Sequence, residues 1–146
     1  MNATGIALAL TLALTGLSAA DKKVQMKDLP AAVQKTVRAE EAKGAQIVGL
    51  ATEVEGGKIM YEVETTVGGH TRDLLLDAAG RIVETEEETS LDAVPAAVKT
   101  ALEARGTVGK VETVVKGTTV SYEAVVEKNE KKTEVAVNAA GKPIKP

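Results

Sequence analysis

Cysteine, tryptophan and phenylalanine are absent from this chain of 146 residues, and only two tyrosines are present. The absence of cysteine leaves no disulfide and no cysteine-ligated zinc site. Two aromatic rings do not supply the stacking platforms with which proteins bind single-stranded nucleic acid. The formal net charge of −3 is mild. We therefore predict a core of small aliphatic side chains and no nucleic acid partner.

Charged side chains are also missing from residues 1–20, which hold an apolar run from Ile6 to Leu14 and end in small residues. This layout is typical of a secretory signal peptide cleaved after Ala20. A buried or membrane-spanning helix is the alternative, but the run is shorter than the ~20 residues that span a bilayer. We therefore expect a periplasmic or secreted protein with no stable membrane anchor after signal cleavage.

One segment occurs twice. Tyr61–Gly80 and Tyr122–Gly141 both open with Tyr-Glu, alternate apolar and polar residues, and close on Asp/Asn-Ala-Ala-Gly. Such self-similarity predicts one unit used twice. We divide the chain into a signal peptide at 1–20, a polar lead at 21–27, a first repeat at 28–89 and a second repeat at 90–146. At this length we expect the two units to share one core.

Each predicted repeat begins with a helix. Asp28 is expected to cap the first helix, Pro30 to occupy its first turn, and Gly44 to end it. The second helix is expected to start after Asp92 and to end at Gly106. Helical spacing predicts that these apolar residues face inward: Leu29, Val33, Val37, Val94, Val98, Ala101 and Leu102.

The remainder of each repeat alternates as β-strands do, with turns at 56–57, 68–69 and 77–80 in the first copy. A fourth strand starts near Arg81 and continues into the acidic run that ends at Thr89. The sequence predicts an α+β fold: two tandem α-β-β-β(-β) repeats that form one antiparallel sheet, with two helices packed on one face. Tyr61 and Tyr122 are expected to point toward the helices as the largest core residue of each repeat.

The Leu-Pro-Ala-Ala-Val helix start, the glycine-bounded strand, the Tyr-Glu-Val strand and the Asp-Ala-Ala-Gly turn resemble the PepSY family, from about Asp28 to Ile144. The chain is similar in particular to its exported tandem form, which is like β-lactamase-inhibitor proteins. This resemblance implies an exported, non-enzymatic binding module that inhibits or regulates a secreted hydrolase. The inhibitors use disulfides and aromatic contacts that this chain lacks, so no inhibitory residue is transferred.

If the tyrosines face the helices, the opposite sheet face is strongly acidic. It is either a solvated surface or a docking surface for a basic protein, a secreted or envelope enzyme, with Met60 and Leu75 as apolar anchors. Glu55, Glu112, Val125 and Glu127 share this face. The candidate partner-binding residues are Glu53, Met60, Glu62, Glu64, Asp73, Leu75, Ser121, Glu123 and Glu134.

No cofactor, metal site or catalytic residue is predicted. His70 is the only histidine and lies at a predicted turn, and no Ca²⁺-binding EF-hand loop is present. Ser90 and Ser121 lie outside any Gly-x-Ser-x-Gly motif, and the glycine pairs lack the phosphate-loop pattern. The many carboxylates leave two alternatives open: an envelope protein that senses a ligand or cation, and an enzyme with paired acids.

Overall fold

The computed structural model describes residues 22–145, so the predicted signal peptide lies outside the described residues. Two helices and a single antiparallel sheet confirm the predicted α+β class. None of the described helices is long and apolar enough to cross a membrane. In chain order the elements are β1 (Lys22–Lys23), the 3-10 helix η1 (Met26–Asp28), α1 (Ala31–Ala42), β2 (Gln46–Glu55), β3 (Lys58–Val67), β4 (His70–Leu76), β5 (Ile82–Thr89), α2 (Ala96–Glu103), β6 (Thr107–Lys116), β7 (Thr119–Lys128), β8 (Lys131–Asn138) and β9 (Pro143–Ile144).

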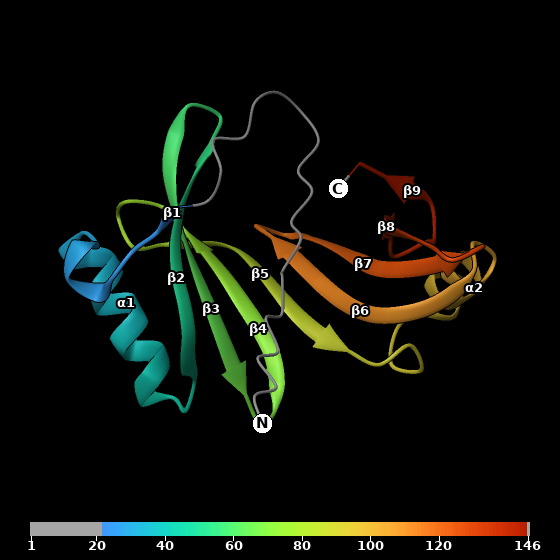
Figure 1. The fold of residues 1–146 in the computed structure, drawn as a ribbon, viewed down its shortest axis with the longest axis horizontal. Coiled ribbons are helices and arrows are strands. Elements are labelled where there is room, and N and C mark those ends of the chain that lie inside the picture. Colours follow the sequence, from blue (N-terminus) through green and yellow to red (C-terminus); the bar gives the residue numbers. More distant parts are fainter. Residues whose placement is uncertain (1–21, 146) are drawn as a thin grey trace.

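The strands lie in the sheet in the same order as in the sequence, from β1 at one edge to β9 at the other. Every neighbouring pair is antiparallel, so each strand pairs with the strand that follows it in the chain. Figure 1 shows α1 and α2 at opposite ends of the molecule, with β5 between the two halves of the sheet. The predicted fourth strand is thus the strand that joins the halves.

The predicted shared core is wrong, because each helix covers its own core. Residues of α1 pack with Val63, Leu74 and Leu76, and Tyr61 lies against this cluster. Residues of α2 pack with strands β6 to β8, and Tyr122 lies against that second cluster. Neither cluster contains a residue of β5. The two helices therefore do not meet over one core. Both tyrosines lie on the helix-covered side of the sheet, as predicted.

The helix starts differ from the prediction. Pro30 and Pro95 are the residues that precede α1 and α2, and neither helix has a side-chain cap. Asp28 does not cap α1, because it lies in η1 and its carboxylate accepts a hydrogen bond from the Gln25 N–H. Asp92 instead pairs with Lys99 at 2.6 Å. At the other end, Gly44 follows α1 with a φ of 103°, as expected.

Gly106 does not end α2, which stops at Glu103. Its φ of 150° leads directly into β6, and an added Cβ there would overlap the Glu127 carbonyl oxygen. The register of the sheet, rather than the helix end, therefore requires glycine at this position.

The two predicted Asp/Asn-Ala-Ala-Gly turns are closed by the same bonds. The Asp77 Oδ1 accepts from the backbone N–H groups of Ala79 and Arg81, both at 3.0 Å. Asn138 Oδ1 accepts the corresponding two bonds, also at 3.0 Å. A side-chain oxygen that accepts from its own turn stabilises the reversal, so both turns confirm the predicted use of Asp and Asn.

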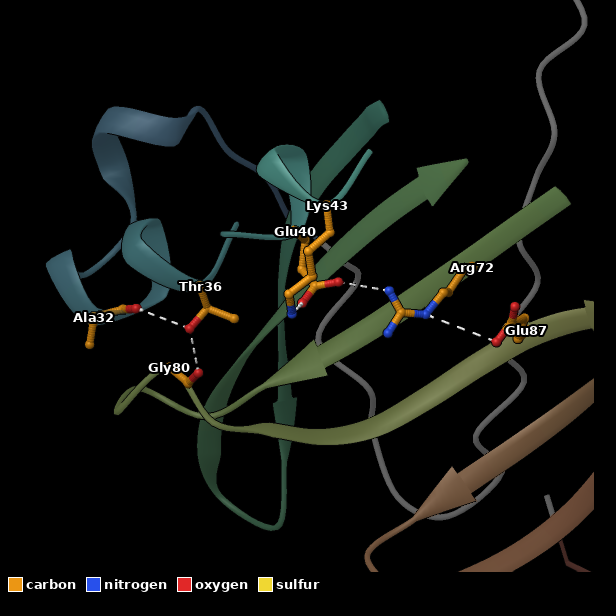
Figure 2. Close-up of polar contacts among 7 residues, drawn as sticks. All are labelled: Ala32, Thr36, Glu40, Lys43, Arg72, Gly80 and Glu87. Atoms are coloured by element: carbon orange, nitrogen blue, oxygen red, sulfur yellow. Dashed lines mark hydrogen bonds and ion pairs between the residues drawn. The ribbon is translucent and has the colours of Figure 1, made fainter. Parts of the chain in front are cut away.

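A buried ion pair that the sequence pattern did not reveal ties α1 to β4. The Glu40 side chain is 5% exposed, and its carboxylate pairs with Lys43 at 2.7 Å and with Arg72 at 2.8 Å. Figure 2 shows the Arg72 guanidinium between Glu40 and Glu87, which lies 4.0 Å away on β5. The hydrogen bonds from Lys43 and Arg72 lower the pKa of Glu40, because they favour its ionised form.

Replacing Arg72 with methionine is expected to lower the free energy of unfolding by about 1.5 kcal/mol at pH 7. A buried carboxylate that loses one partner costs more than an exposed one, and Lys43 remains to offset part of the loss. Chemical denaturation measures the change. Because the pKa of Glu40 is depressed in the folded protein, the effect should shrink as the pH falls through that lowered pKa. A loss that persists undiminished at pH 3 would contradict the ion-pair explanation.

Candidate functional site

The helix-free face of the sheet collects the nine predicted partner-binding residues. Several are directly paired across strands: Glu53 with Met60, Glu62 with Leu75, and Glu64 with Asp73. In the second half, Glu123 and Glu134 are hydrogen bonded side chain to side chain. Ser121 pairs with Val114 and Asn138. In the strand order of the sheet, β5 and β6 lie between these two groups.

Strand β5 supplies the residues that sequence reasoning missed. Its alternation turns Glu84, Glu86 and Glu88 to this face, where Glu86 pairs with Asp73 on β4 and with Val114 on β6. Glu88 pairs with Glu112 in the same way. We call the carboxylates that cross the middle of the sheet the acidic band: Glu64, Asp73, Glu84, Glu86, Glu88, Glu112, Glu123 and Glu134. The acidic band joins the two predicted halves of the site.

One lysine shows that this face is concave. Lys116 at the end of β6 contacts Glu55 on β2 and Glu84 on β5, each at 2.9 Å. In a flat sheet β2 and β6 would lie roughly 19 Å apart, four strand spacings. Two side chains cannot bridge that distance, so the sheet must bend toward this face. These two hydrogen bonds raise the pKa of the Lys116 ammonium.

Carboxylates from three neighbouring strands, β4, β5 and β6, converge on this face. Asp73, Glu86 and Glu112 each place an oxygen within 4.8 Å of the others, and all three are half-buried. Lys110 pairs with Glu112 at 2.6 Å. Among the described residues no lysine or arginine nitrogen pairs with Glu86 or Glu123. The centre of the face therefore holds more carboxyl groups than lysines paired with them.

Burial and mutual repulsion raise the pKa of these central groups. Burial, followed by the charges of Glu112 and Glu123, raises the pKa of Glu86 to about 8. Burial, and then the hydrogen bond and charge of Glu134, raises the pKa of Glu123 to about 7. The pKa of Asp73 is also raised, chiefly by burial. Near neutral pH this face consequently holds protons that ordinary carboxylates would have released.

Apolar anchors are less accessible than predicted. The predicted anchor Met60 is only 8% exposed. The polar candidate residue Ser121 is also 8% exposed. Leu75, between Glu62 and Glu84, is half-buried. Charge rather than apolar area therefore dominates what this face offers to a partner.

The described residues do not form a complete cation site on this face. Ca²⁺ takes roughly six to eight oxygen ligands around one point. Asp73, Glu86 and Glu112 offer one convergent oxygen each, and the Lys110 ammonium already lies against Glu112. His70 is exposed at the start of β4, as expected for a turn residue. The geometry thus favours a surface for an extended basic group over a coordination site for one ion.

Neither models of known protein families nor curated protein sequences match this chain. Solved structures do. A DUF2874 family protein from Bacteroides ovatus is 22% identical, with a TM-score of 0.61 over 80% of this chain and 85% of that one. A candidate periplasmic protein from Bacteroides eggerthii is 21% identical, with a TM-score of 0.64 over 80% and 86%.

A BLIP-like protein from Bacteroides fragilis, named for its likeness to a β-lactamase inhibitor protein, is 20% identical, with a TM-score of 0.57 over 80% and 83% of the two chains. At these identities the likeness concerns the fold and not the partner. The chain therefore has the fold of the DUF2874 family and BLIP-like proteins.

Proposed function

We propose that this protein is an exported, non-enzymatic binding module of the PepSY type that inhibits or regulates a secreted hydrolase. Its concave acidic face would hold a basic surface of that partner. The observation that carries the proposal is the excess of half-buried carboxylates over the lysines paired with them, at the centre of the sheet face that neither described helix covers. Placing cationic groups there would offset repulsion that the free protein bears. The fold shared with BLIP-like and candidate periplasmic proteins supports both the location and the inhibitory role.

Affinity capture from an envelope extract, followed by mass spectrometry, tests the proposal with matched variants. Charge reversal at Glu62 and Glu64, on the concave face, should weaken capture of the partner at least about tenfold. Charge reversal at Glu41 and Glu103, both exposed on the helices, changes the net charge equally and should leave capture intact. A partner retained equally by both double variants would contradict docking on this face. If the partner is a hydrolase, adding the protein should reduce its turnover.

The second candidate is an envelope protein that senses a ligand or cation. The convergence of three carboxylates within 4.8 Å favours it, while the small number of oxygens disfavours it. Calorimetric titration with Ca²⁺ and Mg²⁺ distinguishes the two functions. Saturable binding with a defined stoichiometry, abolished by Glu112→Gln, would support the sensor. An absence of heat together with partner capture would support the docking module.

A further inference from the structure

We propose that a basic partner displaces protons from the centre of the acidic band when it docks, so that docking is strong above neutral pH and weak below it. This inference rests on the proposed function, since it concerns how the same face is regulated. It adds a property that the charge of the face alone does not imply: the docking surface reports the pH of its compartment.

Geometry makes Glu86 the central group. It lies on the middle strand of the sheet and pairs directly with Asp73 and Val114. Its carboxylate and those of Asp73 and Glu112 converge within 4.8 Å. The charged groups that share this face are Lys23 on β1, Glu53 and Glu55 on β2, Lys58, Glu62 and Glu64 on β3, Asp73 on β4, Glu84 and Glu88 on β5, Lys110, Glu112 and Lys116 on β6, Glu123 and Glu127 on β7, and Lys132 and Glu134 on β8.

The two lysines that form ion pairs with the acidic band, Lys110 and Lys116, are already engaged. Lys116 is held by Glu55 and Glu84, and Lys110 is held by Glu112. Neither is paired with Glu86 or Glu123. Burial, together with the carboxylates that converge around them, raises the pKa of Glu86 to about 8 and that of Glu123 to about 7, so both groups hold protons near neutral pH in the free protein.

A cationic partner changes this balance. A guanidinium or ammonium group placed among these carboxylates favours their ionised form, so their pKa values fall toward the ordinary range and the protons leave. Binding then becomes tighter as the pH rises between the bound and free pKa values, by roughly tenfold per pH unit for each proton released. An ordinary surface carboxylate, fully ionised at pH 6, would give no such dependence.

Titration calorimetry with a hexa-arginine peptide at pH 7.4 measures the displaced protons without requiring the natural partner. The same titration is made in PIPES and in Tris, whose heats of protonation differ, and the difference in binding heat gives the number of protons released. We expect about one proton per peptide and an affinity that falls roughly tenfold or more from pH 7 to pH 6.

Titrations of variants identify the carboxyl groups that release the protons. Glu86→Gln together with Glu123→Gln should remove most of the proton release while leaving measurable binding. Glu87→Gln is the matched control, because Glu87 neighbours Glu86 on β5 but its 55% exposed side chain lies on the opposite face, near Arg72. If the double variant does not fold, the wild-type protein in two buffers still decides the question.

Equal binding heats in both buffers, or no binding of hexa-arginine at all, would overturn the inference. The two proposals fail separately. Proton-linked peptide binding without any captured envelope protein would leave this inference standing and refute the proposed function. A captured partner whose affinity is the same at pH 6 and pH 8 would refute this inference and leave the proposed function standing.

Discussion

Replacing Glu86 with glutamine is expected to stabilise the protein at pH 8 and to leave its stability at pH 5 unchanged. The carboxyl group is half-buried among like charges, which raise its pKa to about 8 in the folded protein. In the unfolded chain its pKa returns to the ordinary value near 4.5. Between these values the folded protein must hold a proton that the unfolded chain releases.

The direction in which stability changes with pH follows from this difference in pKa. A folded state that binds more protons loses stability as the pH rises, so wild-type stability should decline from pH 5 to pH 8. Allowing for the solvent that reaches Glu86, we expect this group to lower the free energy of unfolding by about 2 kcal/mol between pH 5 and pH 8. Glutamine carries no charge at either pH and should abolish the contribution of Glu86, while the raised pKa of Glu123 leaves a smaller decline. The lowered pKa values of Glu40, Asp77 and Asp92 act only below this window.

Chemical denaturation at pH 5 and pH 8 measures the effect in the wild type, in Glu86→Gln and in the control Glu87→Gln. The control should follow the wild type, because Glu87 is exposed on the other face of β5. A wild-type protein that is more stable at pH 8 than at pH 5 would show that the acidic band is better solvated than its packing indicates.

Alanine at Gly80 is expected to destabilise the protein by about 3 kcal/mol, and alanine at Gly141 by a similar amount. Both glycines have positive φ, 76° and 73°. Each also lies directly against a helix: an added Cβ would overlap the carbonyl oxygen of Ala32 at Gly80, and that of Ala97 at Gly141. Because these obstacles are backbone atoms, the helix would have to move away from the sheet.

Gly117→Ala provides the control for backbone strain alone. Its φ is 61°, but nothing lies within 4 Å of an added Cβ. It should cost only about 1 kcal/mol, the strain of a left-handed residue. Equal losses at Gly117, Gly80 and Gly141 in denaturation experiments would show that helix contact contributes nothing. Figure 2 also shows the Thr36 hydroxyl donating to the Gly80 carbonyl, at 2.6 Å, and a displaced helix would break this bond.

Local sequence patterns predicted those parts of the fold that depend on neighbours in the chain. Alternation placed Tyr61 and Tyr122 toward the helices, and helical spacing identified Val33, Val37 and Val98 as buried residues. Since each strand pairs with the next strand in the chain, the sheet is built almost wholly from contacts of this kind. This explains why the sequence was so informative about the fold class.

Contacts between distant segments were not predictable in the same way. The pairing of Glu40 with Arg72 joins a helix to a strand, and no periodicity marks either residue as a partner of the other. The bend that brings Lys116 to Glu55 arises from the whole sheet. Glu84, Glu86 and Glu88 are different, because their alternate spacing is visible in the sequence within the acidic run that ends at Thr89. The sequence therefore predicts the outer residues of the candidate site, and the structure adds those of β5 between them.

The sequential strand order also determines how the protein would respond to mechanical load. The first and last described strands, β1 and β9, form the two outer edges of the sheet, so tension between the chain ends would act across the strands. Hydrogen bonds between antiparallel strands lie perpendicular to those strands, and such a pull breaks them one at a time. Single-molecule stretching should therefore unzip this sheet hairpin by hairpin at low force, with no strand pair that must shear as a whole.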